Sequence, residues 1–356
     1  MVQGSGGIGN VTPNAELVEM AMGYSRSRML CAAARLGVAD ALGDEVRSVD
    51  FLAEKCRADR GALYRLLRAL AGIGLTEETT PEHFRLTALG RPLRRDAPDS
   101  VWASVIFWAD LLADEWSLLT ECVRSGKKAA EVRDPKVASR WSQEPDGFGI
   151  FRAVMGTAPV EDYAPIARAW NFSRAKVVAD LGGGGGSLLL AVLGLNPHLR
   201  GMLVDREDSV AAARARFADG EFASRCELLA ADLDEGVPAG ADVHMLKHVL
   251  HGYEDADAID LLRNCRAVLP EDGRLLVIEF VLPAVVSRAD PQIEVRLMSD
   301  LNMLAVTGGR ERSEREWRAL LEAAGFALVR VWPVGADEVM AGSVGILEGK
   351  PVAGSL

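Results

Sequence analysis

The sequence lacks several features that would by themselves define a class of protein. Its 356 residues include only five cysteines, which are scattered and form no CxxC pair, so neither a disulfide framework nor a zinc ribbon is expected. The most apolar window, residues 101–119, is interrupted by Asp110, Asp114 and Glu115, which argues against a membrane span. We therefore expect reduced thiols and a cytoplasmic protein.

The sequence also carries fewer positive than negative charges. The formal net charge is −11 and the sequence pI is about 5.1, whereas nucleic acids and anionic membranes require a basic face. The sequence therefore predicts neither partner and favours chemistry on a small molecule. A length of 356 residues with 49% hydrophobic residues suggests two folding units. Residues 1–12 are Gly-rich and are expected to form a disordered leader.

The first folding unit is expected to span residues 13–170 and to be mainly helical. Leucines 63, 66, 67 and 70 recur at helical spacing, and Ser48 and Asp59 stand where N-caps of two short helices would lie. An alternating stretch near residues 75–90 follows, which completes the outline of a winged helix. Such modules often bind DNA, but the acidic residues around the expected helices make phosphate attraction weak.

From residue 171 to residue 356 the pattern changes to short apolar runs that alternate with helix-like stretches. Such alternation predicts an α/β fold, with a doubly wound and mostly parallel sheet covered by helices on both faces. Two helices flanking Gly308-Gly309 are expected late in the chain. Two closing strands, expected to be antiparallel, complete this second unit.

Five consecutive glycines, residues 182–186, lie between the first apolar run and the next helix-like stretch. In a doubly wound sheet this turn faces the ligand crevice. Gly182, Gly184 and Gly186 satisfy GxGxG, whereas the third glycine of a dinucleotide fingerprint is missing. Asp180 would repel a pyrophosphate but suits the cationic amino group of S-adenosylmethionine, so the sequence favours that cofactor over a dinucleotide.

Two further carboxylates are expected at the ends of the next two strands. Asp205 could accept hydrogen bonds from ribose hydroxyls, which suits either cofactor, and Asp232 could hold the exocyclic amine of adenine. Capping of turns is the alternative explanation for both aspartates. A nicotinamide-dependent oxidoreductase would account for the glycines and Asp205, but not for Asp180 and Asp232.

Taken together, the stretches "VVADLGGGGGSLLL", "LVDR", "LLAADL", "LKHVLHGYEDADAIDLLRNC", "GRLLVIEF" and "GGRERSEREWRALLEAAGF" resemble the class I S-adenosylmethionine-dependent small-molecule O-methyltransferases of plant phenolic and bacterial polyketide and antibiotic pathways. The resemblance implies a Rossmann-like catalytic domain, an N-terminal winged-helix-like domain for dimerisation that also covers the substrate, and a homodimer. It also implies cofactor and acceptor contacts. For the cofactor these are Asp180, Gly182, Gly184, Gly186, Asp205, Arg206, Asp232, Leu233, Lys247 and Tyr253; for the acceptor they are Phe151, Met155, Asn302 and Val306.

His251 is the expected catalytic base. A phenol is mostly protonated at neutral pH, and a neutral imidazole has a suitable proton affinity. His251 should follow the fourth strand at the edge where the methyl group would lie, and it matches the family's catalytic histidine. Glu279, expected at the end of the fifth strand, and Glu311 match the two family glutamates beside that base. Gly252 departs from the aspartate usual in the family.

The three histidines 244, 248 and 251 would share one face if they lay on a single helix, which would suggest a metal site. "ADVHMLK" instead alternates as a strand, so His244 and His251 should belong to different elements, and no metal is expected. The acceptor is expected to be an aromatic natural-product intermediate, for example an orsellinate-type polyketide, either free or bound to a carrier protein.

Overall fold

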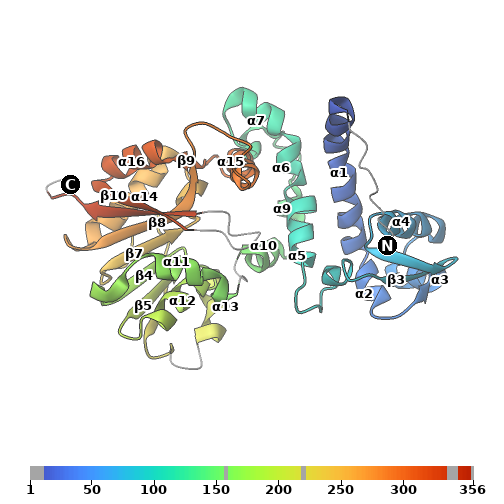
Figure 1. The fold of residues 1–356 in the computed structure, drawn as a ribbon, viewed down its shortest axis with the longest axis horizontal. Helices are drawn as coiled ribbons and strands as arrows, with labels where there is room; N and C mark the ends of the chain where they lie inside the picture. The colour runs from blue at the N-terminus through green and yellow to red at the C-terminus, as the bar shows by residue number, and fades with distance from the viewer. Residues whose placement is uncertain (1–11, 156–158, 218–221, 335–343, 354–356) are drawn as a thin grey trace, which may run out of the picture. The chain divides into compact units, whose positions relative to one another are not determined.

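The computed structural model describes residues 12–155, 159–217, 222–334 and 344–353. The chain forms two compact units (Figure 1), one made of residues 1–114 and 139–150 and the other of residues 115–138 and 151–356. The expected single boundary at residue 170 therefore does not match the packing. Except for Thr12, the expected leader lies outside the described residues.

The boundary differs because two segments of the helical half pack on elements of the catalytic half. Ile166 and Ala167, on α11 (Ala164–Ala169), are buried in the same apolar cluster as Leu189. Helices α7 (Leu119–Ser125) and α8 (Ala129–Val132) lie against α15 (Ile293–Val306). Helical periodicity shows that these segments are helices, but it does not show which core they join.

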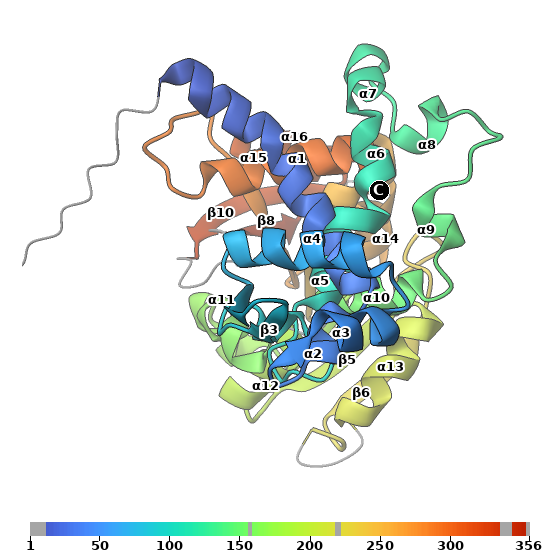
Figure 2. The same cartoon turned by 90° about the vertical axis from the view of Figure 1, so that its right-hand side faces the viewer.

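The first unit contains the predicted winged-helix outline. The Ser48 hydroxyl caps α3 by accepting from the Phe51 N–H at 3.3 Å, and the Asp59 carboxylate caps α4 by accepting from the Ala62 N–H at 2.8 Å, which confirms both N-caps. Figures 1 and 2 show α2, α3, α4 and β3 grouped together. The elements are α1 (Pro13–Arg35), α2 (Val38–Leu42), β1 (Arg47–Ser48), α3 (Val49–Cys56), α4 (Arg60–Gly72), β2 (Thr76–Thr80), β3 (His83–Leu86), η1 (Arg91–Leu93), α5 (Trp102–Ile106), η2 (Phe107–Leu111) and α9 (Arg140–Gln143).

A buried carboxylate joins the helices of this unit. Asp110, on η2, is 3% exposed and lies within salt-bridge distance of Arg28, Arg35 and Arg140. Burial opposes ionisation, but hydrogen bonds and the positive charge of these arginines lower the pKa of Asp110 overall. A buried charge is tolerated only when it is paired in this way.

The second unit is built on an eight-stranded sheet. The strand order is β10-β11-β8-β7-β4-β5-β6, and β9 pairs with β8 outside this path. Strands β4 to β8 pair in parallel, whereas β10 and β11 are antiparallel, as predicted. The strands are β4 (Val177–Leu181), β5 (Arg200–Asp205), β6 (Cys226–Ala230), β7 (Val243–Lys247), β8 (Arg274–Leu282), β9 (Arg312–Ser313), β10 (Phe326–Pro333) and β11 (Val344–Pro351).

Helices cover both faces of this sheet (Figure 1), as the doubly wound pattern requires. One apolar cluster includes Leu189 and Phe217, and another includes Leu261 and Trp317.

Among the described residues, no helix combines the length and apolar character needed to cross a membrane. The remaining elements are α6 (Ala113–Ser117) and α10 (Gly147–Met155), which span the division between the units, and η3 (Val160–Tyr163), η4 (Phe172–Arg174), α12 (Ser187–Leu195), α13 (Glu207–Phe217), η5 (Leu250–Gly252), α14 (Asp255–Val268) and α16 (Glu314–Ala323).

Candidate active site

The glycine turn joins β4 to α12, and its glycines are required by conformation and packing. Gly182, Gly184 and Gly186 have φ angles of 71°, 55° and 76°, which L side chains rarely adopt. A Cβ atom at Gly183 would lie 2.5 Å from Leu203 Cδ1 and 2.6 Å from Asp180 Cγ. Protein atoms therefore fill the space beside Gly183. Beside Gly184, by contrast, no heavy atom of the described residues beyond its chain neighbours lies within 4 Å of a built Cβ.

Asp180 lies under this turn and is 1% exposed. Neither carboxylate oxygen has a hydrogen-bond partner of normal geometry among the described residues. Burial raises the pKa of Asp180 to about 7, with Asp205 adding to the rise while Lys247 and the Leu189 backbone amide oppose it. Buried polar groups in folded proteins are nearly always partnered, so this carboxylate fits the cationic amino group of a ligand.

Asp205 and Asp232 both accept hydrogen bonds from backbone N–H groups, Asp205 from its own turn and from the glycine turn. Asp205, the last residue of β5, accepts from the Gly184 N–H at 2.8 Å and from the Arg206 N–H at 2.7 Å. Asp232 accepts from the Asp234 N–H at 3.0 Å. Each carboxylate oxygen has a second lone pair, so both residues keep acceptor capacity for a ligand.

The other residues expected to bind the cofactor lie at the same edge of the sheet. Lys247 ends β7; its Nζ is 5.3 Å from the Tyr163 ring centroid, and burial lowers its pKa although Glu279 and Asp180 oppose this. Tyr253 follows η5, where burial and Asp234 raise its pKa to about 12. Leu233 is buried near Gly182, and Arg206 is exposed.

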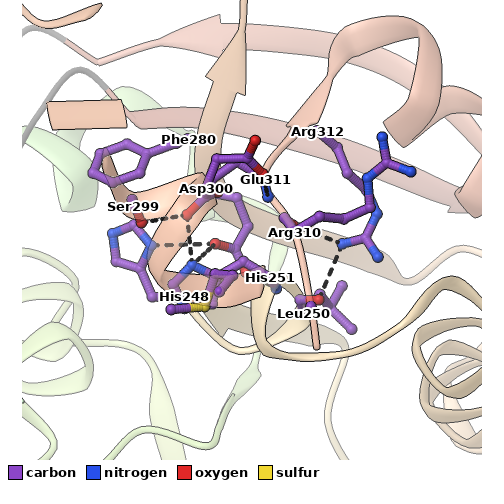
Figure 3. Close-up of polar contacts among 12 residues, drawn as sticks. His248, Leu250, His251, Phe280, Ser299, Asp300, Arg310, Glu311 and Arg312 are labelled. Atoms are coloured by element: carbon purple, nitrogen blue, oxygen red, sulfur yellow. Dashed lines mark hydrogen bonds and ion pairs between the residues drawn. The ribbon is translucent and has the colours of Figure 1, made fainter. Parts of the chain in front are cut away.

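The structure brings the expected base together with both glutamates. His251, on η5, places Nδ1 2.8 Å from Glu311 Oε1 and 3.7 Å from Glu279 Oε2. A carboxylate only accepts hydrogen bonds, so Nδ1 carries the proton and Nε2 keeps a free lone pair. The Ser299 hydroxyl donates to the same Glu311 oxygen at 2.7 Å, as Figure 3 shows.

The groups around Glu279 favour its ionised form. Glu279 is fully buried; burial works against ionisation, but His251, His248 and the His251 backbone amide lower its pKa overall. For His251, burial disfavours the charged form, but Glu279 and Glu311 outweigh it and raise the pKa. The pair of carboxylates can therefore stabilise an imidazolium at this position.

Glu279 does not end its strand, as the sequence suggested, but lies within β8, three residues before its end at Leu282. The strand is longer because β11 pairs with it through Phe280 and β9 pairs with its last two residues. From this rigid position Glu279 accepts hydrogen bonds from the backbone N–H groups of Val249, at 3.0 Å, and His251, at 3.3 Å.

A second segment holds the His251 loop from the other side. The Arg310 N–H donates to the His251 carbonyl at 2.8 Å. The Arg312 side chain donates to the carbonyls of Leu250 and Tyr253, and Figure 3 shows its contact with Leu250. These contacts with backbone carbonyls anchor the loop on both sides of Gly252.

His248 was not predicted as a site residue, yet the structure places it in the site. Its φ angle is 51°, which turns the chain after β7. Its Nδ1 lies 3.2 Å from Glu279 Oε2, and its ring centroid lies 5.2 Å from that of His251. Burial and Lys247 lower its pKa to about 4, against the pull of Glu279. In the sequence, only the spacing of three residues between His248 and His251 could have indicated that His248 belongs to the site.

His244 belongs to a different environment, as predicted. It lies on β7, is fully buried, and neither ring nitrogen has a hydrogen-bond partner among the described residues. Burial lowers its pKa to about 4. It therefore has no place in a shared three-histidine site.

The four residues expected around the acceptor lie on two helices. Phe151 and Met155, on α10, are 36% and 46% exposed. On α15, Asn302 is buried and its amide oxygen accepts from Trp116 Nε1 at 3.1 Å, while Val306 is half-buried. Asn302 therefore holds α15 against Trp116, whatever other role it has.

Comparison with known proteins agrees with this geometry. Residues 160–327 match the O-methyltransferase domain family, and residues 18–96 match the O-methyltransferase dimerisation domain family. The chain is 38% identical to O-demethylpuromycin-O-methyltransferase of Streptomyces alboniger, over 88% of this chain and 84% of that protein. It is 34% identical to the mitomycin biosynthesis 6-O-methyltransferase of Streptomyces lavendulae, over 90% and 91% of the two chains.

Solved structures are also similar. The structure named LaPhzM superposes with a TM-score of 0.84 at 32% identity, over 96% of this chain and 100% of the other. The neocarzinostatin O-methyltransferase NcsB1, solved with S-adenosylmethionine and 2-hydroxy-5-methyl naphthoic acid, gives a TM-score of 0.75 at 29% identity, over 92% and 96%. The matches cover both halves of the chain.

We predict that Gly309→Ala destabilises the protein. A methyl group at Gly309 would overlap the carbonyl oxygen of His251 and crowd the Gly252 backbone, and overpacking of this kind costs about 1–3 kcal/mol. Thermal unfolding should show a lower Tm for this variant. Gly252→Ala is the matched control, since among the described residues no heavy atom beyond its chain neighbours lies within 4 Å of a Cβ built there. Equal Tm values for the two variants would contradict the prediction.

Proposed function

Because this chain belongs to the S-adenosylmethionine-dependent O-methyltransferase family, we propose that it methylates a phenolic hydroxyl of an aromatic natural-product intermediate, with His251 as general base. The observation that carries the proposal is the 2.8 Å contact of His251 Nδ1 with Glu311 Oε1. This contact fixes the tautomer in which Nε2 can accept a proton. Glu279, buried beside it, supplies the second negative charge.

When bound, S-adenosylmethionine supplies a methyl group on a cationic sulfur. His251 Nε2 would accept the proton of the phenolic hydroxyl as that oxygen takes the methyl group, and the departing product would be S-adenosylhomocysteine. Glu311 and Glu279 stabilise the imidazolium that results. The loop contacts of Arg310 and Arg312 hold the base in place, and such positioning supplies much of the rate of a displacement.

The cofactor-contacting residues are proposed from the glycine turn and the carboxylates around it. Asp180, with no hydrogen-bond partner among the described residues, would bind the amino group of the methionine moiety. Asp205, with Arg206, would bind the ribose, while Asp232 and Leu233 would contact the adenine. Lys247 and Tyr253 would line the adenosine side. The backbone of Gly182, Gly184 and Gly186 would contact the ligand, and the open space lies beside Gly184.

The acceptor is proposed to be an aromatic polyketide of the orsellinate type, free or tethered to a carrier protein. The naphthoic acid bound by NcsB1 is an aromatic acid of comparable chemistry, and the mitomycin relative belongs to an antibiotic pathway. Phe151 and Met155 offer exposed apolar surface for an aromatic ring. Asn302 and Val306 are proposed to complete the acceptor contacts.

We further propose that the chain works as a homodimer in the cytoplasm. The dimerisation family match covers residues 18–35 of α1, and Leu17, Met20 and Tyr24 of this helix are 65%, 63% and 70% exposed. Exposed apolar surface of this kind marks an interaction site. The proposed compartment rests on the five free cysteines, since reduced thiols are the rule in the cytosol.

The two alternatives receive less support. Arg60 of the winged-helix outline is paired with Asp50 and Glu82, both at 2.7 Å, so its charge is already neutralised and phosphate attraction is weak. The function of a nicotinamide-dependent oxidoreductase does not explain why His251 is paired with two glutamates. Titration with NAD tests that alternative directly.

We predict that His251→Ala lowers kcat by about 10²–10⁴-fold, the usual contribution of a general base. Binding of S-adenosylhomocysteine should stay within about threefold of wild type, because the imidazole is not among the proposed cofactor contacts. Steady-state kinetics with a phenolic acceptor and calorimetric titration provide the two measurements. His83→Ala, at an exposed site in the first unit, is the control, and full activity of His251→Ala would exclude His251 as the base.

We predict that Asp180→Asn weakens binding of S-adenosylhomocysteine by about tenfold or more. The substitution keeps the shape of the side chain but removes the charge that would face the amino group, and a hydrogen bond to a charged group contributes about 1.5–3 kcal/mol. Calorimetric titration measures the Kd, with NAD in a parallel cell. Asp208→Asn, at an exposed carboxylate, should bind normally; unchanged binding by Asp180→Asn, or binding of NAD alone, would refute the proposed cofactor site.

We predict that the double variant L17E/M20E is monomeric. Burying two unpaired carboxylates in an interface costs several kcal/mol, so light scattering coupled to size-exclusion chromatography should show half the mass of wild type. V285E/V286E is the matched control, because Val285 and Val286 are also exposed apolar residues, at 81% and 55%, but belong neither to α1 nor to the dimerisation match. A dimeric L17E/M20E variant would contradict the role of α1.

A further inference from the structure

His248, His251 and Glu279 form a cluster whose geometry suits more than proton transfer. One potential ligand atom from each lies within 4.8 Å of the other two. Glu279 Oε2 lies 3.2 Å from His248 Nδ1 and 3.7 Å from His251 Nδ1. In a tetrahedral site with bonds of about 2.0–2.2 Å, neighbouring ligand atoms lie about 3.3–3.6 Å apart. The two distances therefore need little adjustment.

The donor set identifies the kind of cation. Two imidazoles and one carboxylate are the ligands of catalytic and inhibitory zinc sites, whereas magnesium and calcium prefer oxygen ligands alone. Glu311 adds a second carboxylate next to His251, and its Oε2 is buried with no hydrogen-bond partner among the described residues. Two carboxylates and two neutral imidazoles would balance the charge of a divalent cation.

The cluster is both accessible and held in place. The side chains of His248 and His251 are 22% and 16% exposed, whereas those of Glu279 and Glu311 are fully buried. Figure 3 shows the two imidazoles next to Ser299 and Glu311. A cation can therefore approach from the imidazole side and meet carboxylates that are already fixed.

We propose that His248, His251 and Glu279 bind Zn²⁺ or a similar borderline divalent cation, and that this binding inhibits methyl transfer. The metal takes the Nδ1 lone pair of each imidazole, and the proton that each Nδ1 carried moves to Nε2. His251 Nε2 then bears a hydrogen and has no lone pair for the phenolic proton. The cation is therefore an inhibitor that competes with the base tautomer, not a requirement for catalysis.

The inhibitory effect rests on the proposed function of His251, but the binding of the metal does not. His248 distinguishes the two, because it contributes a ligand atom while His251 remains intact in its contact with Glu311. His248→Gln removes the imidazole nitrogen, and His83→Gln, far along the chain in the first unit, is the matched control. Each variant is compared with its own metal-free activity.

The experiment uses untagged full-length protein freed of metal, titrated with Co²⁺ and followed by visible absorption. We expect tetrahedral d–d bands that saturate at one Co²⁺ per chain, without the thiolate charge-transfer band that cysteine ligation would give. His248→Gln should weaken binding by about tenfold or more, since even indirect metal contacts contribute that much, and His83→Gln should match wild type. Absence of the bands, or equal binding by His248→Gln, would overturn the proposal.

Activity provides a separate readout with Zn²⁺. The concentration that halves the methylation rate should rise by about tenfold or more in His248→Gln and stay unchanged in His83→Gln. Cobalt bands in a protein that methylates no phenol would support the metal site and count against the proposed function. Normal methylation that Zn²⁺ does not inhibit, with no cobalt bands, would overturn the metal site and leave the proposed function standing.

Discussion

The site depends on one buried charge, the carboxylate of Glu279. It is fully buried within β8 and is compensated by the backbone N–H groups of Val249 and His251 together with the imidazole of His248. Burial without such partners raises the pKa of a carboxylate, as it does for Asp180. Because the partners of Glu279 come from the segment after β7, the same bonds that keep the charge also fix the loop that carries His251.

A second carboxylate, from a segment sixty residues later, completes this arrangement. Glu311 reaches His251 at 2.8 Å, and its own backbone N–H donates to Asp300 at 2.8 Å. The neighbouring Arg310 binds the His251 carbonyl, so side chain and main chain of the loop are held by the same segment. Close approach of the two backbones requires Gly309 to have no side chain, which explains the glycine there.

Lys247 connects the two halves of the site. Its charge interacts with Glu279 beside His251 and with Asp180 under the glycine turn, although burial lowers its own pKa. The Lys247 ammonium thus interacts with two buried carboxylates. Glu279 has hydrogen-bond partners, whereas Asp180 has none among the described residues. This difference fits the proposal that Asp180 binds a cationic ligand, whereas Glu279 is held by the protein's own hydrogen bonds.

The sequence predicted the features that depend on neighbours along the chain. Alternation of strands and helices identified the doubly wound sheet, and Ser48 and Asp59 were recognised as N-caps because a cap bonds to an amide only two or three residues away. The glycine turn and the carboxylates near strand ends also follow from local order, since parallel strands end at one edge of a sheet.

Tertiary structure decided what depends on packing between distant segments. Residues 115–138 and 151–170 join the second unit because of the cores they pack on, which periodicity alone does not reveal. Glu279 lies inside its strand because later strands extend the pairing, and His248 enters the site because a left-handed residue turns the chain after β7. The sequence by itself determined which chemical groups the chain carries to one edge of the sheet. Only the fold decided which of them meet, because hydrogen bonds and ion pairs require distances of a few ångströms that local pattern does not set.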